Sequence, residues 1–150
     1  MSTFTGRHRS VAGALLFGGA ALGGCAGAPA GSLVATPAPD AAPAQVVQAV
    51  VDAINDRDAE LVAEMTTSGF HDHLEQTWLA RGYLTDATIG ATRDRAGPGT
   101  AYSEANTAAV NLTFTPEQAD SSMTNGEPTT WSVLLVEQDG RWVVFDMGAG

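Results

Sequence analysis

Apolar residues recur at helical spacing in the segment that follows Pro43. They lie three and four positions apart and form one stripe, made up of Val46, Val47, Val50, Val51 and Ile54. This spacing is typical of a helix that buries one face. A proline is tolerated in the first turn, where the backbone N–H has no partner within the helix, and Asp40 is placed to cap that turn. We therefore predict a first helix that begins at Pro43 and ends before Asn55.

Two shorter helical patterns come next. Asp58 stands where an N-cap belongs, ahead of a short apolar stripe made up of Leu61, Val62 and Met65. Asp72 and Glu75 have the spacing of a capping box, which predicts a third helix over about 73–81. Gly82 then follows as a stop signal.

Beyond Gly82 the hydrophobic period drops from that of a helix to two, which is typical of half-buried strands. The predicted strands cover residues 86–91, 102–114, 131–137 and 141–147. Asp139 and Gly140 join the last two strands, and this dipeptide favours a tight type I′ hairpin. The pattern predicts an α+β fold in which three helices pack on one face of a curved, four-stranded antiparallel sheet.

The start of the chain has a different character. Arg7 and Arg9 precede an apolar run over residues 11–24, and the only cysteine of the chain, Cys25, follows directly. The run is shorter than the roughly 20 residues that a spanning helix needs, so it is better explained as the core of a secretory signal. The segment from Leu22 to Cys25, Leu-Gly-Gly-Cys, resembles the lipobox of bacterial lipoproteins.

This resemblance implies that the thiol of Cys25 is alkylated with diacylglycerol and that the chain is cut just before it. The alternative is an ordinary cysteine near a conventional cleavage site. We expect a signal peptide over 1–24, a flexible tether over 25–42 and a folded domain over 43–150. The tether is rich in alanine, glycine and proline, which suits a mobile linker. We expect an extracytoplasmic protein, anchored to the cell membrane by its lipid.

Charge narrows the range of partners. The chain has 7 basic and 17 acidic residues, and its formal net charge is −10. Nucleic acid is therefore not an expected partner. An anionic lipid surface would repel this charge as well, so attachment to a membrane must come from a covalent anchor.

Two segments of the predicted domain carry a second resemblance. The helix sequence over 49–59, Ala-Val-Val-Asp-Ala-Ile-Asn-Asp-Arg-Asp-Ala, and the strand sequence over 139–147, Asp-Gly-Arg-Trp-Val-Val-Phe-Asp-Met, resemble the nuclear transport factor 2-like superfamily, together with the order of elements. The resemblance covers about 43–148. It implies a SnoaL-like cone fold with an apolar pocket at its open end, and relatives often form dimers through the outer face of the sheet. The superfamily includes cyclases, isomerases and binding proteins, so the fold does not imply an activity.

Three residues are candidates for acid–base chemistry in such a pocket. Tyr102 and Asp146 share alternation parity with buried positions of their predicted strands, and His71 could act as a base. They support an alternative hypothesis, an isomerase, dehydratase or cyclase. However, none of the superfamily's catalytic motifs matches here residue by residue. Against this hypothesis, Asp146 could simply lie at a frayed strand end, in contact with solvent.

The triplet from His71 to His73 suggests a metal site, because two imidazoles and a carboxylate can bind zinc. The predicted cap argues against it: a capping Asp72 would be occupied by backbone N–H groups, and the two histidines would diverge. We therefore expect neither a metal nor a cofactor. The large aromatic residues could line a ligand pocket or simply fill the core; they include Trp78, Tyr83, Trp131, Trp142 and Phe145. The leading hypothesis is a non-catalytic lipoprotein whose domain binds a small apolar ligand or an envelope protein.

Overall fold

The computed structural model describes residues 34–94 and 102–149. The helices are α1 (Pro43–Asp56), α2 (Ala59–Met65) and α3 (Ser68–Gln76), and the strands are β1 (Tyr83–Arg93), β2 (Thr107–Glu117), β3 (Thr129–Gln138) and β4 (Arg141–Gly148). Cys25 and the predicted signal peptide lie outside the described residues. Within the described part of the chain, no helix combines the length and the apolar character that crossing a membrane requires.

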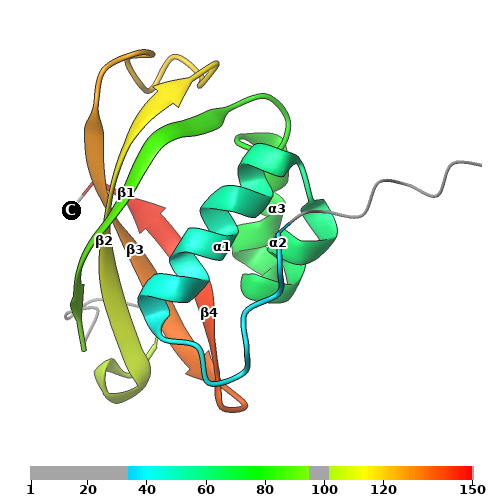
Figure 1. Ribbon diagram of the computed structural model, residues 1–150, viewed down its shortest axis with the longest axis vertical. Coiled ribbons are helices and arrows are strands. Elements are labelled where there is room, and N and C mark those ends of the chain that lie inside the picture. The colour runs from blue at the N-terminus through cyan, green and yellow to red at the C-terminus, as the bar shows by residue number, and fades with distance from the viewer. Residues whose placement is uncertain (1–33, 95–101, 150) are drawn as a thin grey trace, which may run out of the picture. The chain divides into compact units, whose positions relative to one another are not determined.

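The four strands form one antiparallel sheet in the order β1-β2-β3-β4. The three helices pack against one face of this curved sheet, and α1 lies across it (Figure 1). The fold is therefore α+β, as the hydrophobic pattern predicts. The hairpin between β3 and β4 is also confirmed, since Asp139 and Gly140 have φ angles of 53° and 75°, as a type I′ turn requires.

The core lies between the helices and the sheet. All five residues of the stripe predicted for α1 are buried. At one end of the core, three aromatic rings meet edge to face: Trp78, Phe114 and Trp131, with ring centroids 5.2 to 5.9 Å apart. Burial of each large apolar side chain contributes about 1.5–3 kcal/mol, so these rings stabilise the packing of the turn after α3 against the sheet.

Polar side chains at the end of α1 connect this helix to the start of β1. The Asn55 side chain donates to the carbonyl of Leu84 at 3.0 Å and accepts from the N–H of Leu84 at 2.9 Å. Arg57 ends the helix in the left-handed region, with φ of 62°. Its guanidinium donates to the carbonyls of Trp78 and Gly82 and lies over the Tyr83 ring. These bonds fix the turn between α3 and β1.

Two of the three predicted helix caps are wrong. The residue that precedes α1 is Ala42, whose N–H donates to the side chain of Gln45 at 2.9 Å, so Asp40 does not cap this helix. Asp58 does cap α2, because its carboxylate accepts from the N–H of Leu61 at 2.9 Å. The third prediction fails because α3 begins after Thr67 and Asp72 lies inside the helix.

The earlier start of α3 has a tertiary cause. The N–H of Thr67 donates to the carbonyl of Val144 in β4 at 2.9 Å, so the sheet sets where the chain turns into the helix. Phe70 and Leu74, four positions apart, then bury one face of α3. The helix ends at Gln76, and residues 77–81 form turns that bring Trp78 into the core.

The predicted second strand, 102–114, begins later than expected. A 3₁₀ turn over Glu104–Asn106 comes first, and β2 starts at Thr107. Tyr102 therefore lies before the strand. Its spacing from the buried residues of β2 does not indicate which way its side chain faces. A 3₁₀ turn has a period near three, so parity is lost across it.

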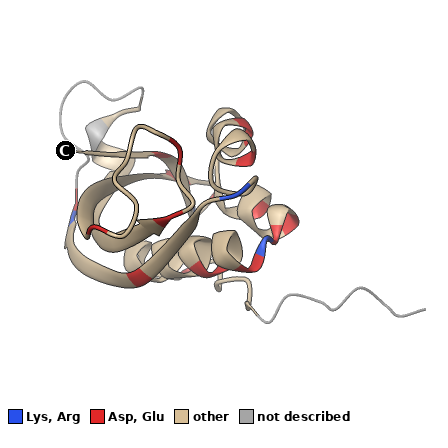
Figure 2. Ribbon diagram, turned by 90° about the horizontal axis from the view of Figure 1, so that it is seen from above, with Lys and Arg blue, Asp and Glu red and all other residues tan. Residues whose placement is uncertain are grey.

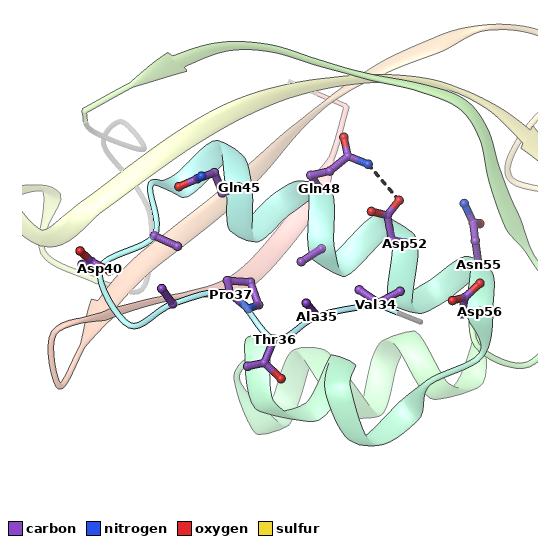
Figure 3. Close-up of a pocket in the computed structure, with 13 residues that line it drawn as sticks. Val34, Ala35, Thr36, Pro37, Asp40, Gln45, Gln48, Asp52, Asn55 and Asp56 are labelled. Atoms are coloured by element: carbon purple, nitrogen blue, oxygen red, sulfur yellow. Dashed lines mark hydrogen bonds between the residues drawn. The ribbon is translucent and has the colours of Figure 1, made fainter. Parts of the chain in front are cut away.

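The predicted tether also differs from the structure at its end. Residues 34–42 run alongside α1 (Figure 3). Val34 packs against the core and Ala41 is buried. The ordered part of the chain thus begins before Pro43, but its contact with the core rests on Val34 and Ala41, and most other side chains over 34–42 are exposed.

Candidate functional site

The three residues proposed for acid–base chemistry lie on different parts of the fold. His71 is on α3, with 17% of its side chain exposed. The Tyr102 ring packs edge-on against Phe145 of β4, with centroids 4.7 Å apart. Asp146 is exposed on β4.

A β-bulge explains the position of Asp146. In the pairing of β3 with β4, Leu135 lies opposite Val144 but Leu134 lies opposite Asp146, so β4 has one extra residue. Leu135 faces the core, and Leu134 therefore faces away from it, together with Asp146. The predicted parity of Asp146 with Val144 is wrong for this reason.

Within the described ranges, none of these three residues lines either of the two hollows described below. The structure does not bring two of them together in a cavity, which is the arrangement that the acid–base hypothesis needs. The large aromatic residues do not form one group either. Trp78 and Trp131 belong to the core cluster, while Phe145 lies against Tyr102.

A groove of about 740 Å³ lies beside α1. One wall is α1 and the other is the segment over 34–41, which runs along the helix (Figure 3). Val34, Ala41 and Ala49 give it an apolar floor. Its polar residues are Thr36, Asp40, Gln45, Gln48, Asp52, Asn55 and Asp56. We call this hollow the acidic groove.

The charge of the acidic groove is of one sign. Its lining residues include three aspartates and neither lysine nor arginine. Asp40 lies near the start of α1, and Asp52 and Asp56 lie toward its end (Figure 3). Asp52 accepts a hydrogen bond of 2.9 Å from the Gln48 side chain. Acidic residues outnumber basic ones over the described fold as a whole (Figure 2). The groove therefore offers a negative potential to its occupant.

Half of the groove could be found from the sequence. Gln48, Asp52 and Asp56 are spaced by four, so they share the face of α1 that does not carry the apolar stripe. A polar helix face usually contacts only solvent, so the sequence of this face did not indicate a binding site. The second wall, over 34–41, was predicted to be a tether, so the hollow between the two walls was missed.

A second hollow lies between the end of α3 and the loop that joins β2 to β3. This cleft holds about 100 Å³ and has the rings of Trp78 and Trp131 among its walls. His73, Arg81 and Asp120 also line it, so the cleft carries both signs of charge. It is too small for most organic ligands, which occupy about 300 Å³ or more.

The pKa of Asp120 is held below its ordinary value. The largest cause is the hydrogen bond of 2.5 Å from the Ser122 hydroxyl, followed by the bond of 2.8 Å from the Ser122 N–H. The positive charges of Arg81 and His73 lower it further. Each of these interactions favours the ionised carboxylate.

We expect the Ser122→Ala variant to raise the pKa of Asp120 toward its ordinary value, since the hydroxyl donor is lost while the N–H remains. The midpoint can be measured by NMR titration of the Asp120 carboxyl carbon. Because the pKa is lowered in the fold, Asp120 stabilises the folded state above the ordinary aspartate pKa, and this contribution is lost as the pH falls through the lowered value. An unchanged midpoint in Ser122→Ala would contradict the assigned cause.

Comparison with known proteins finds similarity to solved structures alone. No family model matches the chain, and no curated protein matches its sequence. The solution structure of a protein from Rhodopseudomonas palustris that contains a SEC-C motif has a TM-score of 0.55 and 12% identity, over 77% of this chain and 83% of that one. The crystal structure of an NTF2-like transpeptidase from Campylobacter jejuni has a TM-score of 0.46 and 14% identity, over 71% of this chain and 99% of that one. At 12% identity, the first likeness shows a shared fold alone. The second has a TM-score below 0.5, and we draw no conclusion from it.

Proposed function

We propose that this protein is an extracytoplasmic lipoprotein, anchored to the cell membrane through Cys25, whose nuclear transport factor 2-like domain binds a cationic ligand or a basic protein segment in the acidic groove. The single observation that carries the binding proposal is a groove of about 740 Å³ whose lining residues contribute three carboxylates and no basic side chain. The anchor is supported by the order of charge, apolar run, small residues and cysteine at the start of the chain.

The groove has the features of a binding surface for an extended, positively charged chain. Its apolar floor can contact the aliphatic part of a lysine or arginine side chain, while the aspartates contact the charged end. The glutamine and asparagine side chains add hydrogen-bond donors and acceptors for a backbone. No covalent chemistry is needed for this role.

The anchor would keep the groove close to the membrane. Val34 lines the groove and lies nine positions after Cys25 in the chain, with eight residues between them. A fully extended chain covers at most about 3.3–3.6 Å per residue, so Val34 stays within about 30 Å of the lipid-bearing sulfur. A partner in the same membrane or in the layer just above it is therefore within reach.

The proposal predicts that a basic peptide binds and that groove charges decide its affinity. We expect a fluorescent tetralysine peptide to bind the full chain about 2- to 30-fold more weakly when Asp52→Asn and Asp56→Asn are combined. This follows because each lost exposed ion pair contributes about 0.2–1 kcal/mol. Fluorescence anisotropy at low salt gives the dissociation constants, and added salt should weaken the wild-type complex.

A matched double variant separates the groove from general attraction to an acidic protein. Glu117→Gln with Glu137→Gln removes the same charge from exposed strand positions that do not line the groove. We expect less than a twofold change for this pair. Equal losses in both double variants would show that the peptide senses net charge only, and the groove proposal would then be abandoned.

A further inference from the structure

We propose that His71, Asp72 and Glu75 form a site for a divalent transition-metal ion such as Zn²⁺ on the surface of α3. The nitrogen and oxygen atoms that these side chains offer all lie within 4.8 Å of one another. The site shares no residue with the acidic groove and does not depend on the function proposed for it.

The register of α3 creates this cluster. Because the helix begins at Ser68, His71 and Glu75 are four positions apart and Asp72 and Glu75 are three apart within regular helix. Residues with these spacings are neighbours on a helix surface. If Asp72 capped the helix, backbone N–H groups would occupy its carboxylate. The residue that precedes α3 is Thr67 instead, so the cap does not occupy the oxygens of Asp72.

The imidazole of His71 supplies an independent observation. Its Nε2 atom is buried and has no hydrogen-bond partner in the described structure. The nearest carboxylate oxygen, on Glu75, is 4.0 Å away, too far for a hydrogen bond. A buried polar atom without a partner is unfavourable, because it has lost its hydrogen bond to water and gained none in return. A cation between Nε2 and the Glu75 carboxylate would satisfy both groups.

The donor set selects a class of ion. One imidazole nitrogen and two carboxylate oxygens suit Zn²⁺ and other first-row transition ions, whereas Ca²⁺ and Mg²⁺ favour oxygen ligands alone. Three donors no more than 4.8 Å apart have a common centre within about 2.8 Å of each of them. Zinc requires about 2.0–2.2 Å, so each donor must move inward by at most about 0.7 Å. Asp72 and Glu75 are exposed and can make this movement by rotation. Water would complete the coordination.

His73 provides a matched control on the same helix. It is two positions from His71, so it leaves the helix on a different side, and its ring stacks on Phe70 with centroids 6.2 Å apart. It is not part of the cluster. Replacement of His73 removes one imidazole from α3 and leaves the proposed site intact.

The test is calorimetric titration of ZnCl₂ into the full chain that carries Cys25→Ala, purified without a histidine tag, so that no thiol competes for the metal. We expect binding at one site, at least tenfold weaker in His71→Ala and in Glu75→Gln, and unchanged within twofold in His73→Ala. Circular dichroism confirms that each variant is folded. Addition of Zn²⁺ should also shift the NMR signals of the His71 imidazole. Absence of binding, or an equal loss in His71→Ala and His73→Ala, would overturn the proposal.

Discussion

Replacement of Cys25 by alanine is expected to move the protein from the membrane fraction to the soluble fraction almost completely. The proposed anchor is the diacylglycerol on this sulfur, and each buried methylene contributes about 0.8 kcal/mol to membrane binding. One acyl chain holds a protein only reversibly, whereas two give stable attachment. The acidic chain offers no electrostatic substitute, because its net charge of −10 is repelled by anionic lipids.

Fractionation of cells that express each form measures the distribution, and mass spectrometry of the wild-type protein measures the lipid directly. A Leu22→Asp variant is a second arm, because it disrupts the predicted lipobox while it retains the cysteine. It should also lose the lipid. If the Cys25→Ala protein stays in the membrane fraction, or if the wild-type thiol is unmodified, the anchor is wrong and the binding domain must be placed elsewhere.

Removal of the Arg57 side chain has the second-largest expected effect, a loss of about 2–4 kcal/mol in the free energy of unfolding for Arg57→Ala. Its guanidinium donates to the carbonyls of Trp78 and Gly82 in the turn before β1, and it lies 4.1 Å from the centre of the Tyr83 ring. Hydrogen bonds to a charged group contribute about 1.5–3 kcal/mol each, and a cation over an exposed ring adds about 0.5–1 kcal/mol. Because Arg57 is half-buried and both bonds share one nitrogen, we expect the total to be smaller than the sum of these values. Without the guanidinium, two carbonyls of the turn lose their donor.

Urea denaturation followed by tryptophan fluorescence measures this loss, since Trp78 lies in the affected turn. We expect Arg57→Lys to lose part of this free energy, because an ammonium does not stack on the Tyr83 ring as the planar guanidinium does, although both hydrogen bonds come from a single nitrogen. Arg141→Ala, at an exposed position in the β3–β4 hairpin, should change the stability by less than about 0.5 kcal/mol. A loss in Arg57→Ala no larger than that in Arg141→Ala would show that the turn does not depend on Arg57.

The acidic groove and the proposed metal cluster show why candidate sites were harder to predict than the fold. The polar face of α1 was visible in the sequence, but its opposite wall comes from residues 34–41, whose composition is typical of a linker. His71 and Asp72 were recognised as potential ligands. Their convergence with Glu75 depends on where α3 begins, and a contact from Thr67 to β4 determines that.

Local sequence patterns were enough to predict the order of the elements, the buried stripe of α1, the cap at Asp58 and the hairpin at Asp139 and Gly140. These features depend on neighbours within a few positions, and the spacing of apolar residues or the chemistry of one turn is enough to specify them. The start of α3, the face on which Asp146 lies and the contacts of Val34 and Ala41 with the core could be known only from the folded chain. Each of these depends on a distant segment, through a hydrogen bond to β4, the bulge against β3 or contact with α1, and a local pattern contains no information about such partners.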